Sequence, residues 1–289
     1  MIQDFTYHKP KSLDEALGML SEYEDNHIIA GGQSLLLVMR EGMVSTEHMI
    51  DIKHLKELNY LKFDEKDGLR IGACVPHREV EHSDIVKKHY PALHDIEDRL
   101  ANAQIRNWGT MGGNIAHADP AEDPATCYLA YDAEITLKSK NGERTIPIDE
   151  FLLGFYETCL EPGEMVTEIH IPAPGKKSSS AFTKFTLLEN DLGVASVTAR
   201  VTLDGSGKCQ AAAIALGCVG DRTLRATEAE EYMKGKSYDD KVFAEAGKIA
   251  AENVETLADI HATAETRKHE VEILTKRMLK LAWDRAKEA

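Results

Sequence analysis

The sequence predicts an α+β protein with two domains. Short strand candidates alternate with helical segments through the first 75 residues, which is typical of α/β or α+β topology. A β-hairpin pattern then appears near residue 200, and helical segments follow it. The chain has 289 residues, more than one average domain, so two domains are the expected number.

The first helix is predicted by its capping signal and by its apolar spacing. In "SLDEALGMLSEY", Ser12 stands at the N-cap position and Glu15 completes a capping-box pattern. Apolar residues recur with the spacing of one helical face, at Leu13, Ala16, Leu17 and Leu20. The apolar runs that follow predict short buried strands: "HIIAGG", "MIDIKHL" and "LRIGACV".

The middle of the chain predicts a helix, a hairpin, a further strand and a linker. Residues 84–104 have a helical pattern that runs into a glycine-rich segment. Residues 127–152 predict a strand, a turn at Asn141-Gly142 and a second strand, and "EMVTEIHIP" predicts another. The following "APGKKSSSA", residues 173–181, has the composition of a linker. We therefore expect a first domain at residues 1–175 and a second at residues 176–289.

The second domain is predicted to combine a sheet with helices. Residues 197–203 alternate between apolar and polar side chains, and residues 204–207 have a turn pattern, which together predict a hairpin. Residues 225–289 predict helices. In the last helical segment we expect one face to pack into the core, formed by Val271, Leu274, Met278 and Leu281.

Composition limits the classes of partner. The formal net charge is −15, and no basic stripe with interleaved aromatic residues is present, so a nucleic-acid partner is not expected. No apolar run approaches the roughly 20 residues of a membrane span, and the N-terminus lacks the pattern of a secretion signal. The five cysteines are scattered without C-x-x-C spacing, so we expect reduced, mostly buried thiols in a cytoplasmic protein.

Two glycine pairs carry the functional prediction. The first lies in "IIAGGQSLLLVMREG", residues 28–42, and the second in "IRNWGTMGGNIAHADPAEDP", residues 105–124. Glycine permits positive φ and lets a ligand approach bare backbone, and successive N–H groups in such turns can bind an anion. Two such loops would suit a pyrophosphate. Each pair alone is also consistent with an ordinary tight turn, and neither a Rossmann fingerprint nor a P-loop is present.

Four segments in register resemble a known family. "IIAGGQSLL", "QIRNWGTMGGNIAHADPAED", "EPGEMVTEIHIP" and the closing "DIHATAETRKHEVEILTKRML" are similar to the FAD-binding, medium subunit of the molybdenum hydroxylases. This group includes carbon monoxide dehydrogenase, xanthine dehydrogenase and quinoline oxidoreductase. The resemblance implies an FAD domain of the vanillyl-alcohol-oxidase (PCMH) type with two α/β subdomains, followed by a smaller α+β domain.

The resemblance also implies which residues bind FAD. One loop would wrap the pyrophosphate with its N–H groups: Ala30, Gly31, Gly32, Gln33, Ser34 and Leu35. A second would close on it from the other side: Thr110, Gly112, Gly113 and Asn114. Ile115 would pack near the flavin and Lys184 would also lie near it. Asp123 would bind the adenosine ribose, and Val166 would contact the adenine end through its backbone.

The chain departs from the family pattern at a few positions. Met111 stands where Ile or Val is common. Asp119 and Glu122 add carboxylates near Asp123, which leaves open which acid would face the ribose. His117 is interpreted as a structural hydrogen-bonding residue, with covalent flavin attachment as the lesser alternative.

The resemblance implies an electron-transfer flavoprotein subunit with no catalytic residue and no metal ligands of its own. Its partners would be a small iron–sulfur subunit and a large molybdopterin subunit, assembled as a dimer of heterotrimers. The cysteine spacing agrees with clusters carried by a partner. Two alternatives remain open: a stand-alone flavin oxidoreductase of the same fold, and a nucleotide-binding regulatory or scaffold protein.

Overall fold

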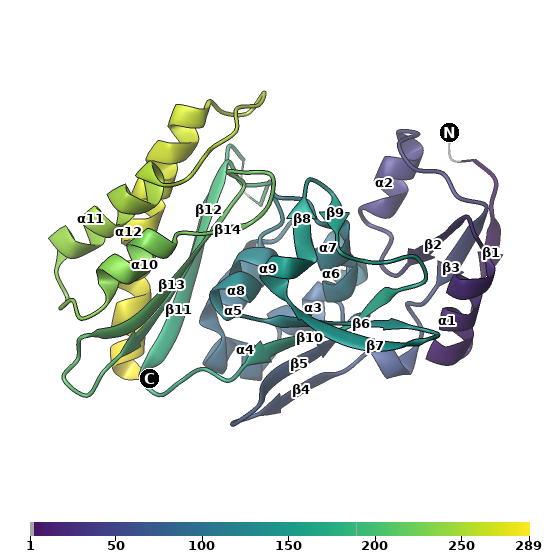
Figure 1. Ribbon diagram of the computed structural model, residues 1–289, viewed down its shortest axis with the longest axis horizontal. Coiled ribbons are helices and arrows are strands. Elements are labelled where there is room, and N and C mark those ends of the chain that lie inside the picture. The colour runs from purple at the N-terminus through teal and green to yellow at the C-terminus, as the bar shows by residue number, and fades with distance from the viewer. Residues whose placement is uncertain (1–2, 189) are drawn as a thin grey trace. The chain divides into compact units, whose positions relative to one another are not determined.

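The protein forms two compact units, each assembled from separated stretches of chain. The structure, a computed structural model, describes residues 3–188 and 190–289 (Figure 1). Unit 1 comprises Met1–Val80, Asn102–Ala118 and Ala133–Ile171. Unit 2 comprises Glu81–Ala101, Asp119–Asp132 and Pro172–Ala289.

Unit 1 begins with a small parallel sheet covered by a helix. Strand β3 (His48–Asp51) lies between β1 (Thr6–His8) and β2 (Asn26–Ile29), and both neighbours run parallel to it. Helix α1 (Leu13–Glu22) starts as predicted, because the Ser12 hydroxyl accepts a hydrogen bond from the N–H of Glu15. The predicted apolar face of α1 packs into one core cluster with residues of β3 and the loop after it.

A five-stranded sheet forms the rest of the framework of unit 1. Its order is β4 (Leu61–Asp64), β5 (Gly68–Gly72), β10 (Met165–Pro172), β6 (Glu134–Ser139) and β7 (Gly142–Pro147). The predicted turn at Asn141-Gly142 joins β6 and β7 as an antiparallel hairpin. Shorter elements complete the unit: α2 (Leu35–Arg40), η1 (Lys56–Leu58), α3 (His77–Glu81), α6 (Ala103–Trp108), α7 (Met111–His117), α9 (Ile148–Phe151), β8 (Leu152–Gly154) and β9 (Glu157–Thr158).

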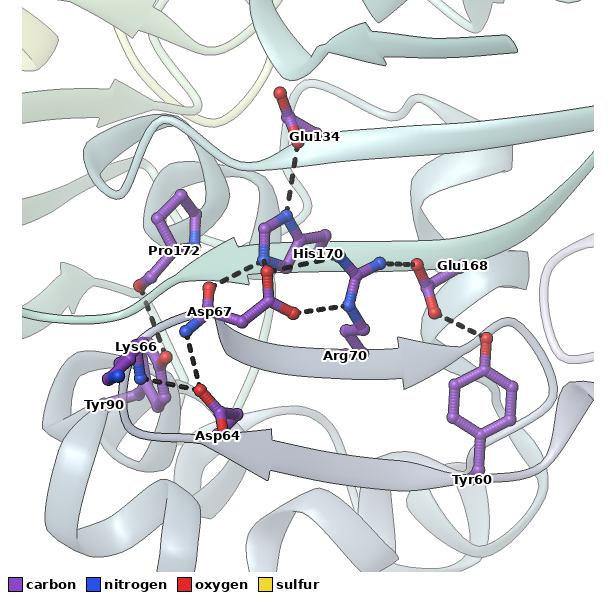
Figure 2. A network of polar contacts seen from close by, with 10 residues as sticks. All are labelled: Tyr60, Asp64, Lys66, Asp67, Arg70, Tyr90, Glu134, Glu168, His170 and Pro172. Atoms are coloured by element: carbon purple, nitrogen blue, oxygen red, sulfur yellow. Dashed lines mark hydrogen bonds and ion pairs between the residues drawn. The ribbon is translucent and has the colours of Figure 1, made fainter. Parts of the chain in front are cut away.

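A network of charged side chains ties neighbouring strands of this sheet together (Figure 2). The Arg70 guanidinium on β5 lies 2.7 Å from Asp67 and 2.6 Å from Glu168 on β10. Glu168 also accepts a hydrogen bond from the Tyr60 hydroxyl at 2.7 Å. His170, two residues further along β10, lies 2.8 Å from the Asp67 carbonyl oxygen. The network joins residues about 100 positions apart, and no pattern in the sequence predicts it.

Unit 2 is an antiparallel sheet with helices on both faces (Figure 1). Its order is β11 (Ser178–Phe185), β12 (Ala195–Leu203), β13 (Cys209–Gly217) and β14 (Leu224–Arg225), so the predicted hairpin is confirmed. Alternate residues of β12 share a core with α10 (Thr227–Met233), α11 (Asp240–Glu252) and α12 (Ala264–Glu288). Thr198 points to the opposite face, where its hydroxyl lies 2.7 Å from that of Thr126 in α8 (Pro124–Ala130).

The linker prediction is wrong for residues 178–181. These residues are the buried start of β11, and Ser180 is inaccessible to solvent. Its hydroxyl oxygen accepts a hydrogen bond from the N–H of Ala92 at 3.1 Å and lies 2.8 Å from the Tyr131 hydroxyl. A serine-rich run can occupy a core strand because these partners satisfy its buried polar groups.

Several predicted element boundaries are also wrong. The helix expected at 84–104 is three helices: α4 (Asp84–His89), α5 (Pro91–Arg99) and the start of α6. Pro91 has no N–H to continue α4 and begins α5 instead. Residues 127–130 belong to α8 and not to a strand, and residues 253–263 are not helical. Leu281, expected in the core, is 38 % exposed, while Val271, Leu274 and Met278 are buried as predicted.

Four of the cysteines are buried and Cys159 is partly buried, all with free thiols, as expected. Within the described residues, no helix combines the length and the apolar character needed to cross a membrane.

Two glycines in helices, one in each unit, predict opposite effects of substitution by alanine. A Cβ at Gly247 in α11 would lie 2.3 Å from the Glu272 carbonyl oxygen in α12, whereas a Cβ at Gly18 in α1 would contact nothing within 4 Å. We expect Gly247→Ala to lower the free energy of unfolding by about 1–3 kcal/mol through overpacking. Gly18→Ala should raise it by about 0.5–1 kcal/mol through helix propensity. Denaturant unfolding of both variants tests the packing; equal effects of the same sign would contradict it.

Candidate functional site

The first glycine pair packs directly on the backbone of the second glycine-rich segment. Strand β2 ends at Ile29, and α2 starts at Leu35 after a turn in which Gly32 has φ +70°. A Cβ at Gly31 would lie 2.1 Å from the carbonyl oxygen of Trp108 and 2.7 Å from the Cα of Gly109. Only glycine permits this approach, so the two segments that the sequence singled out lie side by side in unit 1.

The first segment presents a row of unused backbone donors. Across the described chain, no acceptor is found for the N–H groups of residues 31–35. The Gln33 side chain folds back, and its amide donates to the Gly31 carbonyl at 3.1 Å. Because five successive N–H groups are free of internal partners, this segment, with Ala30 at its start, can bind an anion.

The second segment is the start of a helix, where a loop was expected. Thr110 is the N-cap of α7, and its hydroxyl accepts the N–H of Gly113 at 3.2 Å. Met111 and Gly112 donate to the carbonyls of Val75 and Ala73, at 2.9 and 3.0 Å. These N–H groups therefore fix α7 against the chain after β5 and are already satisfied.

The side chain of Asn114 has a hydrogen-bond acceptor that no protein group uses. Its N–H is bonded to the Thr110 carbonyl at 2.9 Å, but its side-chain oxygen Oδ1 is buried without a partner. Buried polar atoms are nearly always hydrogen-bonded in folded proteins. Asn114 Oδ1 therefore fits a donor on a bound ligand.

Two more of the predicted residues lie buried in unit 1. Ile115 is on α7 and is 1 % exposed. Val166 lies on β10 opposite Leu137, at a shift in the strand register between Val166 and Glu168. Such a shift leaves backbone groups outside the regular ladder, which is compatible with a ligand contact through the backbone of Val166.

Lys53 is a residue beside this site that the sequence did not single out. Its ammonium nitrogen lies 3.6 Å from the centre of the Trp108 ring and donates to the Trp108 carbonyl at 3.3 Å. Burial lowers its pKa, and the negative charge of Asp51 opposes that shift. Lys53 thus contacts the same carbonyl oxygen on which Gly31 packs. Only the fold brings these positions together, since 55 residues separate Lys53 from Trp108.

In unit 2, Asp123 and Lys184 form a buried ion pair. The Lys184 ammonium on β11 lies 2.6 Å from Oδ2 of Asp123, and the two side chains are 5 % and 4 % exposed. The other oxygen of Asp123, Oδ1, is buried without a partner. Burial raises the pKa of Asp123 from 3.8 to about 6, against the opposing effect of Lys184. One oxygen of this carboxylate therefore remains available to a ligand hydroxyl.

The pKa of Glu122 is shifted in the same direction as that of Asp123, without a cation to oppose the shift. Burial raises its pKa well above the ordinary value, and the charges of Asp119 and Asp123 add to the shift. Asp123, in contrast, has the Lys184 ammonium beside it, which opposes the effect of burial on its pKa. Asp123 is therefore a carboxylate held by a buried cation, the ammonium of Lys184. His117 lies in α7 in unit 1, with its ring 5.1 Å from that of Tyr156.

Comparison with known proteins matches the chain over nearly its whole length. Residues 3–174 match the FAD binding domain in molybdopterin dehydrogenase, and residues 180–282 match the CO dehydrogenase flavoprotein C-terminal domain. The carbon monoxide dehydrogenase medium chain of Hydrogenophaga pseudoflava is 32 % identical, over 97 % of this chain and 98 % of that one. The glyceraldehyde dehydrogenase medium chain of Sulfolobus acidocaldarius is also 32 % identical, over 96 % and 98 %.

The chain belongs to the FAD-binding subunits of the molybdenum hydroxylases. Its fold agrees with solved members of this family. Quinoline 2-oxidoreductase from Pseudomonas putida 86 superposes with a TM-score of 0.94, at 31 % identity and 99 % coverage of both chains. Carbon monoxide dehydrogenase from H. pseudoflava superposes with a TM-score of 0.93, at 33 % identity and the same coverage.

The residues of this FAD-binding subunit fit its cofactor. In unit 1, the free N–H groups of residues 31–35 suit a pyrophosphate, and the partnerless side-chain oxygen of Asn114 suits a ligand donor. In unit 2, taken by itself, Oδ1 of Asp123 suits a ligand hydroxyl. Among the described residues, no three His, Cys, Asp or Glu side chains are grouped so that they could hold a metal ion.

The raised pKa of Asp123 predicts a pH-dependent contribution to stability. Because the folded state holds this proton up to about pH 6 and the unfolded state only to 3.8, folding binds a proton between these values. The contribution is therefore present at low pH and is lost as the pH rises through 6. We expect the unfolding free energy of the wild type, relative to Asp123→Asn, to increase as the pH falls from 7 to 5. Denaturant titrations at both pH values test this, and a relative decrease would contradict it.

Proposed function

We propose that this chain is the FAD-carrying electron-transfer subunit of a multi-subunit molybdenum hydroxylase. It would accept electrons from iron–sulfur clusters in a partner and pass them to an external acceptor. The observation that carries the proposal is the first glycine segment, whose free N–H groups are held against the Trp108 backbone. The end-to-end similarity to medium chains of dehydrogenases supports it.

Unit 1 would bind the phosphates and fix the dinucleotide by its backbone. Residues 30–35 would donate N–H groups to the pyrophosphate, with Lys53 adding positive charge close to Gly31. Thr110 and the helix that it caps, with Gly112, Gly113 and Asn114, would lie against the other side. Since the whole protein is acidic, these local groups and not the overall field must hold the phosphates.

Asp123 and Lys184 would act at one point of the cofactor. The family resemblance assigns the first to the adenosine ribose and the second to the flavin, which are separate parts of an extended dinucleotide. A separation of 2.6 Å favours a shared location for the two side chains. We propose that Lys184 holds the carboxylate in its charged form while Asp123 Oδ1 accepts a hydroxyl of FAD. When bound, FAD supplies the two-electron redox chemistry, and the chain supplies orientation and electrostatics.

We propose a PCMH-type FAD domain in residues 1–175, with the parallel sheet around β3 and the five-stranded sheet as its two subdomains. Residues 176–289 would form the C-terminal domain. The two sheets and the matched ranges 3–174 and 180–282 support this division.

The proposed partners are a small iron–sulfur subunit and a large molybdopterin subunit, in a dimer of heterotrimers in the cytoplasm. Support comes from the relatives, which are named as medium chains, and from the absence of C-x-x-C spacing in this sequence. The substrate would then be bound by the large partner.

Two glycines with the same backbone conformation provide a matched test of the first segment. Gly32 and Gly42 have φ of +70° and +77°, and a Cβ at Gly42 would contact nothing within 4 Å. Valine at either position strains the backbone. Only at Gly32 would the new Cβ also crowd its neighbours, at 3.1 Å from the Ile29 side chain and 3.2 Å from that of Leu36, and so displace the turn that carries the N–H groups. We expect Gly32→Val to lose FAD and Gly42→Val to retain it. Flavin released by acid precipitation is quantified beside a thermal melt of each sample; full occupancy in Gly32→Val would refute this role.

Affinity purification tests the proposed complex. A tagged copy of the chain, expressed in its native host, should bring down two further chains, together with iron and molybdenum in the same fractions. Metal analysis and mass spectrometry of the eluate provide the measurement. If the chain elutes alone with bound FAD and oxidises a small substrate by itself, the stand-alone flavin oxidoreductase replaces this proposal.

A further inference from the structure

Arg267 is a buried arginine in the first turn of α12, and it connects three separate segments of unit 2. The residue is 5 % exposed. Its Nη1 donates to the carbonyl of Val194 at 2.5 Å and also to the carbonyl of Cys218. Its Nη2 lies 2.6 Å from the carboxylate of Asp259. A planar guanidinium can serve all three acceptors at once because its donors point in fixed, divergent directions.

Cys218 links Arg267 to the segment that carries Asp123. The Cys218 carbonyl accepts from Arg267, while its N–H donates to the Pro120 carbonyl at 2.9 Å. Cys218 has φ +65°, an uncommon conformation for a residue other than glycine, so contacts on both sides of it must hold it in place. Pro120 lies three residues before Asp123, at the approach to α8.

Val194 links Arg267 to Lys184. Its carbonyl accepts a hydrogen bond from Arg267, and its N–H donates to the Phe185 carbonyl at 2.7 Å, which joins the end of β11 to the residue before β12, next to Lys184. The preceding residue is Gly193, where a Cβ would lie 2.8 Å from the Cys218 sulfur and 3.6 Å from the Cβ of Lys184. The two segments that Arg267 joins therefore meet beside the lysine.

We infer that Arg267 is a positioning residue for FAD, acting through the Asp123–Lys184 pair. This inference rests on the proposed role of that pair in binding FAD. Through Cys218 and Pro120, Arg267 fixes the segment that carries Asp123. Through Val194, it fixes the end of β11 that carries Lys184. The closing helix thereby sets how Asp123 Oδ1 is presented to the cofactor.

The substitution Arg267→Lys tests this positioning role, because it keeps the positive charge and removes the guanidinium. One ammonium cannot reach two carbonyls and a carboxylate with the geometry of the guanidinium, so the segments at Cys218 and Val194 should loosen. Arg285→Lys is the matched control. Arg285 lies on the same helix and donates to the Asp95 carboxylate at 2.7 Å and the Ser180 carbonyl at 2.8 Å, but Ser180 is four residues from Lys184 along β11.

The measurement is the FAD dissociation constant of the full chain, by fluorescence titration, beside its melting temperature. We expect Arg267→Lys to raise the dissociation constant by on the order of tenfold, the effect of losing about one hydrogen bond of a charged group. Arg285→Lys should lower the melting temperature and leave FAD affinity within about twofold. Equal losses of affinity in both variants would reduce Arg267 to a structural residue and overturn the inference.

A double-mutant cycle separates this inference from the proposed site itself. If Arg267 acts through Lys184, Arg267→Lys should cause little further loss of affinity in a Lys184→Met background. Additive losses would overturn the positioning role. Unchanged affinity in Lys184→Met alone would instead refute the proposed site for the pair. Should Arg267→Lys fail to fold, Asp259→Asn can be used instead, because it removes one partner of the guanidinium. It should also weaken FAD binding, but by less than Arg267→Lys. Unaltered FAD binding in Asp259→Asn would contradict the inference.

Discussion

The contact between Gly31 and the carbonyl oxygen of Trp108 is the constraint on which the site in unit 1 depends. A Cβ at Gly31 would lie 2.1 Å from that oxygen, so the first glycine segment can reach the second only as bare backbone. The close approach fixes the turn after β2 and keeps its N–H groups away from internal acceptors. Lys53 contacts the same carbonyl and places a positive charge where a phosphate would need it.

In unit 2, a series of buried polar contacts positions the residues proposed to bind FAD. Arg267 donates to the carbonyls of Cys218 and Val194, and the N–H groups of these two residues bond the segments that carry Asp123 and Lys184. Burying charges is costly unless their partners are well placed, and a network of this kind specifies a single geometry. The Asp123 oxygen that has no partner is therefore best explained as a group reserved for a ligand.

The elements that were predicted correctly from the sequence are those that short sequence patterns specify. The cap and apolar face of α1, the hairpin at Asn141-Gly142, the alternation along β12 and the two glycine pairs are all visible in short windows. Local composition misled where tertiary contacts override it, because the serines that begin β11 find buried partners in the fold. Likewise, the helical pattern of residues 84–104 did not reveal the new helix start at Pro91.

The contacts that build the candidate site could not be predicted from the sequence. Lys53 meets Trp108 across 55 residues, and Lys184 meets Asp123 across 61. Lysine, aspartate and arginine are ordinary surface residues by composition, and only the fold shows which of them are buried and paired. The glycine pairs could be recognised from the sequence, because a residue without a side chain is a local signal that another part of the chain or a ligand packs closely on its backbone.

A crystal structure of the chain with FAD bound would show directly whether residues 31–35 bind the pyrophosphate. We expect the pyrophosphate within hydrogen-bond distance of the N–H groups of residues 31–35, and a hydroxyl of FAD on Oδ1 of Asp123 with Lys184 still paired to Oδ2. A pyrophosphate bound away from residues 31–35, with their N–H groups facing solvent, would contradict it.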